Sequence, residues 1–153
     1  MTERVLMVCI GNICRSPLAE ALWNHRIGVG KDFSKRAGSA GLYARFGDVI
    51  HPHSQELLNR HGVPLPEEGS TPWSAVDLRS WDLILVMEAS HREEIEQRSP
   101  TMRGRVFTLG HWSSFSIPDP MGKSLQAFEE VYQAIDQGVD EWIKKLGYRI
   151  KAA

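Results

Sequence analysis

The sequence predicts an α/β fold in which a parallel sheet carries helices on both faces. Three apolar runs, at residues 5–8, 82–87 and 105–109, have the continuous hydrophobicity of strands that are buried on both sides. Segments with helical spacing of apolar residues separate these runs, and such alternation implies parallel pairing through right-handed crossovers. We therefore expect the first strand near the centre of the sheet and a ligand site beyond the carboxyl ends of the strands.

The helix after the first strand has start and stop signals. Ser16 suits the N-cap and Pro17 suits the first helical position. Apolar residues then recur at near-helical spacing, and Gly28 or Gly30 can end the helix.

The remaining elements follow in the same alternation. A short strand is expected at residues 33–37, before a loop at residues 38–41. Helices are expected at residues 53–61, where Gly62 stops the helix, and at residues 90–98, before Pro100. The last helix, residues 124–146, is amphipathic because its apolar residues are three and four positions apart: Leu125, Phe128, Val131, Ile135, Val139 and Trp142.

The composition fits an ordinary globular domain. The 153 residues suit a single domain, residues 1–153, with one hydrophobic core. The formal net charge of −1 argues against nucleic acid or an acidic membrane surface as the main partner. A local anion site is still compatible with this charge, because it requires only a few oriented donors.

The cysteines and histidines bear on location and metal binding. Cys9 and Cys14 are too few and too close for a secreted disulfide framework. The first residues lack a secretory signal pattern, and no apolar run approaches a membrane-spanning length. We therefore expect a cytoplasmic protein with reduced thiols and no membrane insertion. We expect no metal, since His51 and His53 have no cysteine or acidic cluster at zinc-ligand spacing.

The loop after the first strand has the features of an anion cradle. Cys9 ends the strand, five residues intervene, and Arg15 opens the helix. Backbone N–H groups of a tight turn can converge on one anion, and the helix N-terminus adds partial positive charge. Gly11 and Asn12 suit the unusual backbone angles of such a turn, and the Arg15 guanidinium can bind two phosphate oxygens at once. The same features stabilise a thiolate at Cys9, which is therefore a candidate nucleophile.

The alternative role for Cys9 is core packing, which is usual for a cysteine at the end of a buried strand. The spacing between Cys9 and Arg15 is by itself a weak signal. The buried strand before the loop, the Gly-Asn pair within it and the Ser-Pro helix start after it together favour the anion site.

Asp119, between Pro118 and Pro120, is a candidate general acid. Cleavage of an aryl phosphate requires a proton for the departing oxygen. The two prolines stiffen the backbone around this one carboxyl group. From the pattern alone, however, a rigid turn without catalytic role is the favoured interpretation.

The chain resembles the low-molecular-weight protein-tyrosine phosphatases over nearly its whole length. The loop and five further segments carry the resemblance: residues 9–17, 39–41, 82–88, 110–112, 117–120 and 128–132. It is nearest to the bacterial branch that partners tyrosine autokinases in capsule and exopolysaccharide export. The resemblance implies a flavodoxin-like three-layer fold with a four-stranded parallel sheet, and hydrolysis of protein phosphotyrosine through a phosphocysteine. It implies no cofactor or metal, and a tyrosine autokinase or related phosphoprotein as substrate.

The resemblance also assigns roles to residues. Cys9 is the nucleophile, Arg15 the phosphate clamp and Asp119 the general acid, whose position matches the Asp-Pro of the family. Asn12 and Ser16 are expected to hold the loop, with Ser39 supporting Asn12. The implied phosphate-binding residues are Ile10, Gly11, Asn12, Ile13, Cys14, Arg15 and Ser16. The implied substrate pocket comprises Ile10, Tyr43, Phe46 and Met121.

Two departures from the family pattern affect these expectations. Met121 stands directly after Asp-Pro, where relatives usually have an aromatic residue. Residues 67–73 lack the His and Arg that many relatives carry before the strand at residues 82–87. The grip on the substrate ring and the support of the loop are therefore expected to differ from those of such relatives.

Two other functions fit parts of the pattern. An arsenate reductase shares the fold and the loop, but its reaction passes a disulfide through further cysteines, and none follows Cys14. A phosphotyrosine-binding module would require neither a nucleophile nor an acid. Cys14 itself is either a resolving thiol that traps oxidised Cys9 as a disulfide or a residue that fills space beneath the loop.

Overall fold

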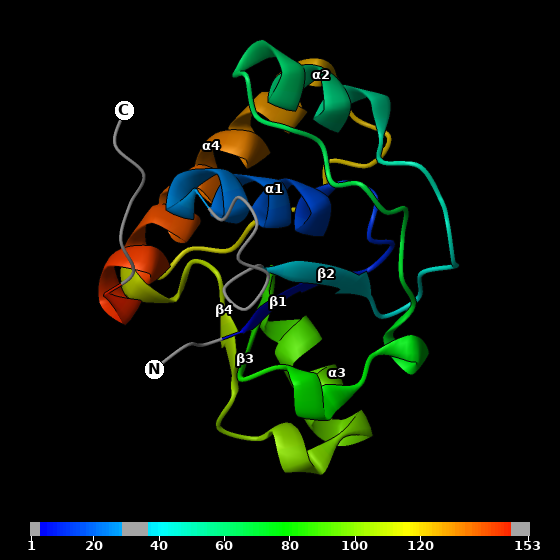
Figure 1. Ribbon diagram of the computed structural model, residues 1–153, viewed down its shortest axis with the longest axis vertical. Coiled ribbons are helices and arrows are strands. Elements are labelled where there is room, and N and C mark those ends of the chain that lie inside the picture. Colours follow the sequence, from blue (N-terminus) through cyan, green and yellow to red (C-terminus); the bar gives the residue numbers. More distant parts are fainter. Residues whose placement is uncertain (1–3, 29–36, 148–153) are drawn as a thin grey trace.

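Four parallel strands form the centre of the fold, which a computed structural model describes for residues 4–28 and 37–147 (Figure 1). The strands are β1 Val5–Cys9, β2 Gly38–Gly41, β3 Leu83–Val86 and β4 Val106–Thr108. Their order across the sheet is β2-β1-β3-β4, so β1 is an inner strand, as predicted. Every pair of neighbouring strands is parallel, which confirms the flavodoxin-like arrangement.

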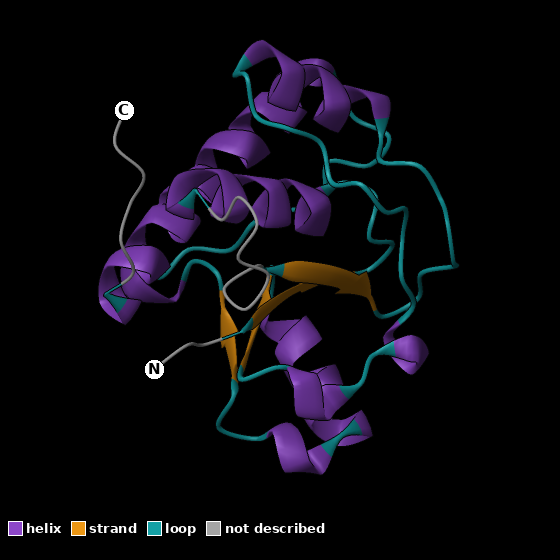
Figure 2. Ribbon diagram, viewed as in Figure 1, coloured by secondary structure: helices purple, strands orange, loops and turns teal. Residues whose placement is uncertain are grey.

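Helices cover both faces of the sheet (Figures 1 and 2). One face carries three helices, which are α1 Arg15–Ile27, α2 Pro52–Arg60 and α4 Leu125–Leu146. The opposite face carries α3 Ala89–Arg98. Alternate residues of β1 point to opposite faces, so Met7 joins the core beneath α1 and α4, whereas Leu6 and Val8 join a second core with Ile95 of α3. Short 3-10 helices lie between these elements: Trp73–Ala75, Leu78–Ser80, Pro100–Met102 and His111–Ser113.

β2 forms on the segment that the sequence predicted as a loop. The expected position of this strand is therefore wrong: the strand runs from Gly38 to Gly41, and residues 33–36 lie outside the described residues. A Cβ atom added to Gly38 would lie 2.6 Å from the Trp81 ring, and one added to Gly41 would lie 2.5 Å from the carbonyl oxygen of Ile10. Close packing thus demands glycine at both positions and overrides the low strand propensity of glycine.

The helix α1 begins two residues earlier than its capping signals predicted. Cys14 occupies the N-cap, and Ser16 lies inside the first turn. Ser16 does not cap the helix, because its hydroxyl group contacts Cys9 and Asn12 instead. Gly28 ends the helix in the left-handed conformation, with φ of 60°. Gly30, the other predicted stop, lies outside the described residues.

The other three helices match their predictions to within one residue. Observed α2 and α3 span Pro52–Arg60 and Ala89–Arg98, against the predicted residues 53–61 and 90–98. The hydroxyl group of Ser124 accepts the backbone N–H of Ala127 and caps α4. These local signals suffice because they act within one helical turn.

Within residues 4–28 and 37–147, no helix has the length and apolar character needed to cross a membrane.

Candidate active site

The loop between β1 and α1 wraps around the sulfur of Cys9. Cys9 is the last residue of β1, and Arg15 is the first residue of α1. Asn12 adopts a left-handed conformation, with φ of 56°, which curls the loop back toward the strand. The backbone N–H of Asn12 donates to the sulfur of Cys9 at 3.3 Å. The loop therefore directs at least one of its N–H groups at the predicted nucleophile.

Two side chains brace this loop from within. The Oγ atom of Ser16 lies 2.9 Å from the sulfur of Cys9, and it accepts Nδ2–H of Asn12 at 2.7 Å. Because the Ser16 hydroxyl accepts from Asn12, its own hydrogen is available to the Cys9 sulfur, at 2.9 Å, or to the carbonyl oxygen of Ala40, at 3.4 Å. The structure thus brings Asn12 and Ser16 together beneath the nucleophile, where the sequence expected residues that hold the loop.

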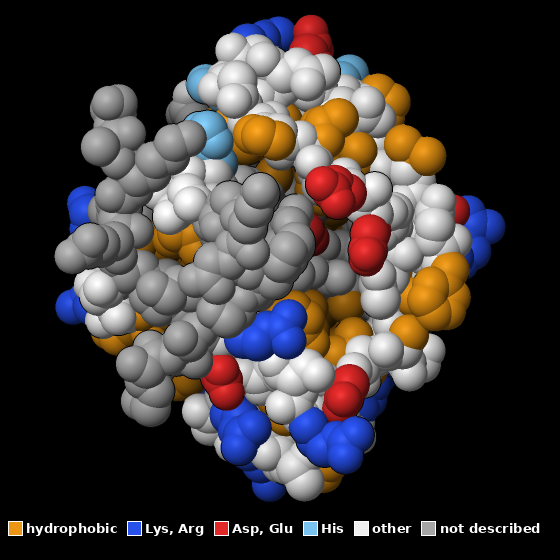
Figure 3. Space-filling model, viewed as in Figure 1, with side chains coloured by type: hydrophobic (Ala, Val, Ile, Leu, Met, Phe, Trp, Pro, Cys, Tyr) orange, Lys and Arg blue, Asp and Glu red, His pale blue; other side chains and the backbone are white. Residues whose placement is uncertain are grey.

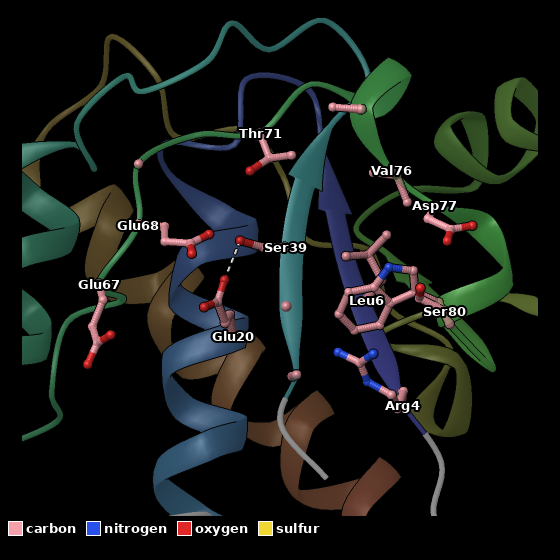
Figure 4. A pocket seen from close by; sticks show the side chains of 15 residues that line it. Arg4, Leu6, Glu20, Ser39, Glu67, Glu68, Thr71, Val76, Asp77 and Ser80 are labelled. Atoms are coloured by element: carbon pink, nitrogen blue, oxygen red, sulfur yellow. Dashed lines mark hydrogen bonds between the residues drawn. The ribbon is translucent and has the colours of Figure 1, made fainter. Parts of the chain in front are cut away.

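Asn12 receives its second support from a backbone group rather than from Ser39. The backbone N–H of Thr71 donates to Oδ1 of Asn12 at 2.9 Å. The hydroxyl group of Ser39 instead donates to the carboxylate of Glu20 (Figure 4). Thr71 lies in the segment that lacks the His and Arg of many relatives, so a main-chain donor provides support there. A backbone contact of this kind has no sequence signal.

The start of α2 binds the outer side of the loop. The backbone N–H of His51 donates to the carbonyl oxygen of Ile13 at 2.8 Å, and the Ser54 hydroxyl donates to that of Cys14 at 3.1 Å. In a trans peptide the N–H points away from the C=O. Fixing these carbonyl groups toward α2 therefore turns the following N–H groups toward the side on which an anion would bind.

Arg15 is buried and held in place by two hydrogen bonds. Only 2% of its surface is exposed. Its Nη1 atom donates to Oε2 of Glu88 at 2.6 Å and to the carbonyl oxygen of Ile117 at 2.8 Å. Glu88 lies two residues after the end of β3, at the same edge of the sheet as Cys9, and sequence reasoning gave it no role. Two signals pointed toward it: its position just beyond a buried strand, and its place at the end of the segment at residues 82–88, which carries the family resemblance.

Asp119 lies on a loop that is tied to the same arginine. Two residues before it, Ile117 accepts from Arg15 and donates its N–H to the carbonyl oxygen of Met87 at 3.0 Å. The Asp119 side chain is exposed, and its Oδ1 atom accepts the backbone N–H of Met121 at 3.0 Å. This loop thus carries the candidate acid next to the end of β3 and the clamp.

Cys14 lies buried beneath the loop, and both cysteines are free thiols. Burial, followed by the negative charges of Cys9 and Asp119, raises the pKa of Cys14 to about 12, against a smaller lowering by Arg15. The Cys14 thiol is therefore protonated at neutral pH.

Three of the four residues expected to wall the substrate pocket are exposed, and the fourth, Ile10, is half-buried. Tyr43, Phe46 and Met121 are 65%, 72% and 46% exposed, respectively. The N–H of Tyr43 donates to the carbonyl oxygen of Ile10 at 3.0 Å, which places the start of this wall beside the phosphate loop. The guanidinium of Arg98 lies 4.8 Å above the Tyr43 ring.

A separate cavity of about 450 Å³ lies along the outer edge of β2 (Figure 4). Ser39, Glu67 and Glu68 are among its lining residues. Asp and Glu side chains gather near the middle of the face that Figure 3 shows. Cys9, Arg15 and Asp119 do not line this cavity, so it is not the candidate reaction site. No group of three or more potential metal ligands occurs in the described part of the chain.

Comparison with known proteins identifies the family of this chain. A family model of the low molecular weight phosphotyrosine protein phosphatases matches residues 4–152. EpsP of Ralstonia nicotianae, a probable low molecular weight protein-tyrosine-phosphatase, is 39% identical over 147 residues, which are 95% of this chain and 97% of that relative. Wzb of Salmonella typhimurium, a low molecular weight protein-tyrosine-phosphatase, is 38% identical over 149 residues, which are 95% of each chain.

A solved structure of a tyrosine phosphatase has the same fold as this chain. The tyrosine phosphatase Wzb from Escherichia coli K30, in complex with sulphate, superposes with a TM-score of 0.87 at 36% identity. The match covers 96% of this chain and 100% of that one. With a thiol-centred loop at the same sheet edge as a buried arginine, and with relatives that match it from end to end, this chain belongs to the low molecular weight phosphotyrosine protein phosphatase family.

Proposed function

We propose that this protein hydrolyses phosphotyrosine in proteins through a phosphocysteine formed on Cys9. The observation that carries the proposal is the loop around the Cys9 sulfur, which receives the N–H of Asn12 and lies 2.9 Å from the Ser16 hydroxyl. Donors directed at a sulfur stabilise its thiolate, and a thiolate is the form that attacks phosphorus. Membership of a phosphatase family supports the same chemistry.

In the first step, the Cys9 thiolate attacks phosphorus in line with the leaving oxygen. The S–P bond forms as the P–O bond to the tyrosine ring breaks. Arg15 and the loop N–H groups bind the equatorial oxygens, where charge is spread in the transition state. Asp119 gives its proton to the departing phenolate, so the tyrosine side chain of the substrate protein leaves as a neutral phenol.

In the second step, water hydrolyses the phosphocysteine. The Asp119 carboxylate takes a proton from the water, whose oxygen attacks phosphorus as the S–P bond breaks. Inorganic phosphate leaves, and the Cys9 thiolate and protonated Asp119 are restored. Since the cycle begins with one ionised and one protonated group, we expect the rate to peak at mildly acidic pH.

The hydrogen bonds of Arg15 suit the clamp role. Glu88 and Ile117 both bind the same atom, Nη1, and so fix the plane of the guanidinium. A planar fork held in one orientation can bind two phosphate oxygens with little further loss of freedom. An arsenate reductase would share this clamp, but the sequence has only two cysteines, both within the loop.

We further propose that the substrate is a tyrosine autokinase or a related phosphoprotein of exopolysaccharide export, in the cytoplasm. The resemblance to the bacterial branch of the family supports this substrate class. Dephosphorylation of such a kinase by the purified protein, compared with unrelated tyrosine-phosphorylated proteins, tests it. Equal rates on all of these proteins would contradict a preference for the kinase.

Turnover of p-nitrophenyl phosphate by the wild type and Cys9→Ser proteins tests the reaction itself. We expect no measurable turnover by Cys9→Ser, together with retained binding of a phosphotyrosine peptide, because the loop and Arg15 remain. We also expect EDTA to leave the wild-type rate unchanged. Substantial turnover by Cys9→Ser would overturn the phosphocysteine, and a large loss with EDTA would indicate a metal-dependent reaction.

A further inference from the structure

A buried histidine, His91, lies behind the phosphate clamp. It belongs to the first turn of α3, which follows β3 and Glu88, and it is only 4% exposed. Its Nδ1 atom is buried and has no hydrogen-bond partner among the described residues. A buried polar atom without a partner destabilises a fold, so its presence calls for a compensating function.

The other ring nitrogen of His91 faces the carboxylate that holds Arg15. Nε2 of His91 lies 3.4 Å from Oε2 of Glu88. The same oxygen accepts Nη1 of Arg15 at 2.6 Å. His91 and Arg15 thus contact the same carboxylate oxygen. The imidazole belongs to α3 and the guanidinium to α1, which lie on opposite faces of the sheet.

Burial, assisted by the positive charge of Arg15, keeps the His91 imidazole neutral at neutral pH. Burial and the positive charge of Arg15 lower its pKa, and together they outweigh the carboxylates of Glu88, Glu94 and Asp119. A neutral imidazole carries a hydrogen on one nitrogen only. With that hydrogen on Nε2, it faces the Glu88 carboxylate oxygen across the 3.4 Å contact, and the lone pair of Nδ1 is the group that is left buried.

We propose that His91 is a positioning residue for the phosphatase reaction, in which its neutral imidazole fixes the Glu88 carboxylate and thereby the orientation of the Arg15 fork. The carboxylate of Glu88 is 37% exposed and has rotatable bonds of its own. Without a second contact, it can change rotamer and carry the Arg15 guanidinium with it. This inference rests on the clamp role of Arg15 proposed above.

The inhibition constant for sulfate, a competitive inhibitor, measures anion binding by Arg15 separately from the catalytic steps. Sulfate is a dianion throughout the working pH range, so its own ionisation does not enter. We expect His91→Leu to raise the inhibition constant for sulfate about ten-fold, because Glu88 loses its second contact. We expect His91→Gln to stay within about three-fold of the wild type, because the glutamine amide can reach the position of Nε2 and donate to Glu88.

The thermal unfolding temperature distinguishes a positioning role of His91 from a packing role. We expect His91→Leu to unfold at the wild-type temperature or above, since leucine removes the unpartnered Nδ1. A mere packing role predicts the reverse pattern, in which the apolar leucine preserves sulfate binding and the polar glutamine impairs it. That pattern, or equal sulfate binding by all three proteins, would overturn the proposal. Ser90→Ala, an exposed neighbour on the same turn, serves as the matched control.

A double-mutant cycle tests whether His91 acts through Glu88. In a Glu88→Gln background, we expect His91→Leu to cause little further loss of sulfate binding. Fully additive losses would show that His91 acts by another route and would contradict the inference. The Arg15→Lys variant tests the clamp role of Arg15 independently of His91. If this variant binds sulfate as tightly as the wild type, the clamp role is wrong, whatever the His91 variants show.

Discussion

The hydroxyl oxygen of Ser16 lies 2.9 Å from the sulfur of Cys9, although Ser16 had been expected to cap a helix. The same oxygen accepts an N–H of Asn12, which leaves the hydroxyl hydrogen for the Cys9 sulfur or for the more distant carbonyl oxygen of Ala40, at 3.4 Å. A hydroxyl group held in this way stabilises negative charge on sulfur at two points of the reaction. It favours the attacking thiolate, and it favours the thiolate that leaves when the phosphocysteine is hydrolysed.

Ser16→Ala should therefore slow turnover without unfolding the protein. A hydrogen bond to a charged group contributes about 1.5–3 kcal/mol, so we expect kcat to fall by about 10- to 100-fold. Steady-state kinetics with p-nitrophenyl phosphate measure this, and Ser74→Ala, at an exposed serine, is the control. An unchanged kcat would show that the Ser16 hydroxyl serves only to hold Asn12.

Asp119→Ala should affect substrates according to their leaving group. A phenolate that is a poor leaving group needs the proton of Asp119, whereas nitrophenolate is stable without one. We expect a loss of about 10²–10⁴-fold for phenyl phosphate and a much smaller loss for p-nitrophenyl phosphate. Asp119→Asn keeps the shape of the side chain but delivers no proton, so it should show the same dependence on the leaving group as Asp119→Ala. If the turnover of both substrates falls by the same factor, Asp119 has a structural role and another group is the acid.

Cys14 is predicted to protect the nucleophile from irreversible oxidation. Cys9 should be the first thiol that peroxide oxidises, to a sulfenic acid, which Cys14 can then attack to form a disulfide and release water. Oxidation removes the Cys9 thiolate charge, which is one cause of the raised pKa of Cys14, about 12 in the reduced protein. After peroxide and then a thiol reductant, the wild type should recover at least about twice the activity that Cys14→Ser recovers.

Mass spectrometry provides the second measurement for Cys14. A linked peptide that contains both cysteines should appear in the oxidised wild-type protein and disappear after reduction. Equal recovery of the two proteins without this peptide would mean that Cys14 only fills space beneath the loop.

The stability of the fold should decrease as the pH falls below about 6.5. Burial lowers the pKa of both His51 and His91 from the ordinary value of 6.5, with further lowering by His53 and Arg15, respectively. Below pH 6.5 the unfolded chain therefore binds more protons than the native protein, so acid favours unfolding. Urea unfolding at a series of pH values should show this slope, and His91→Gln should flatten it. Identical slopes for the two proteins would contradict a neutral buried His91.

Local patterns in the sequence determined most of the elements and the centre of the site. The apolar runs at residues 5–8 and 82–87, the cap at Ser124 and the turn residues after Cys9 act through groups a few positions apart. Interactions of this range depend on backbone geometry and periodicity, which the order of residues specifies directly. The same range covers the loop from Cys9 to Arg15, which is why the sequence identified both residues.

Tertiary structure alone decided what supports that loop and where β2 lies. Glu88 and Ile117 bind Arg15 from 73 and 102 positions away, and the N–H of Thr71 reaches Asn12 across 59 positions. No periodicity predicts such contacts, because the topology β2-β1-β3-β4 sets which chain segments meet at one sheet edge. Gly38 shows the same limit for a strand: the ring of Trp81 leaves no room for a side chain there, so packing rather than propensity places β2.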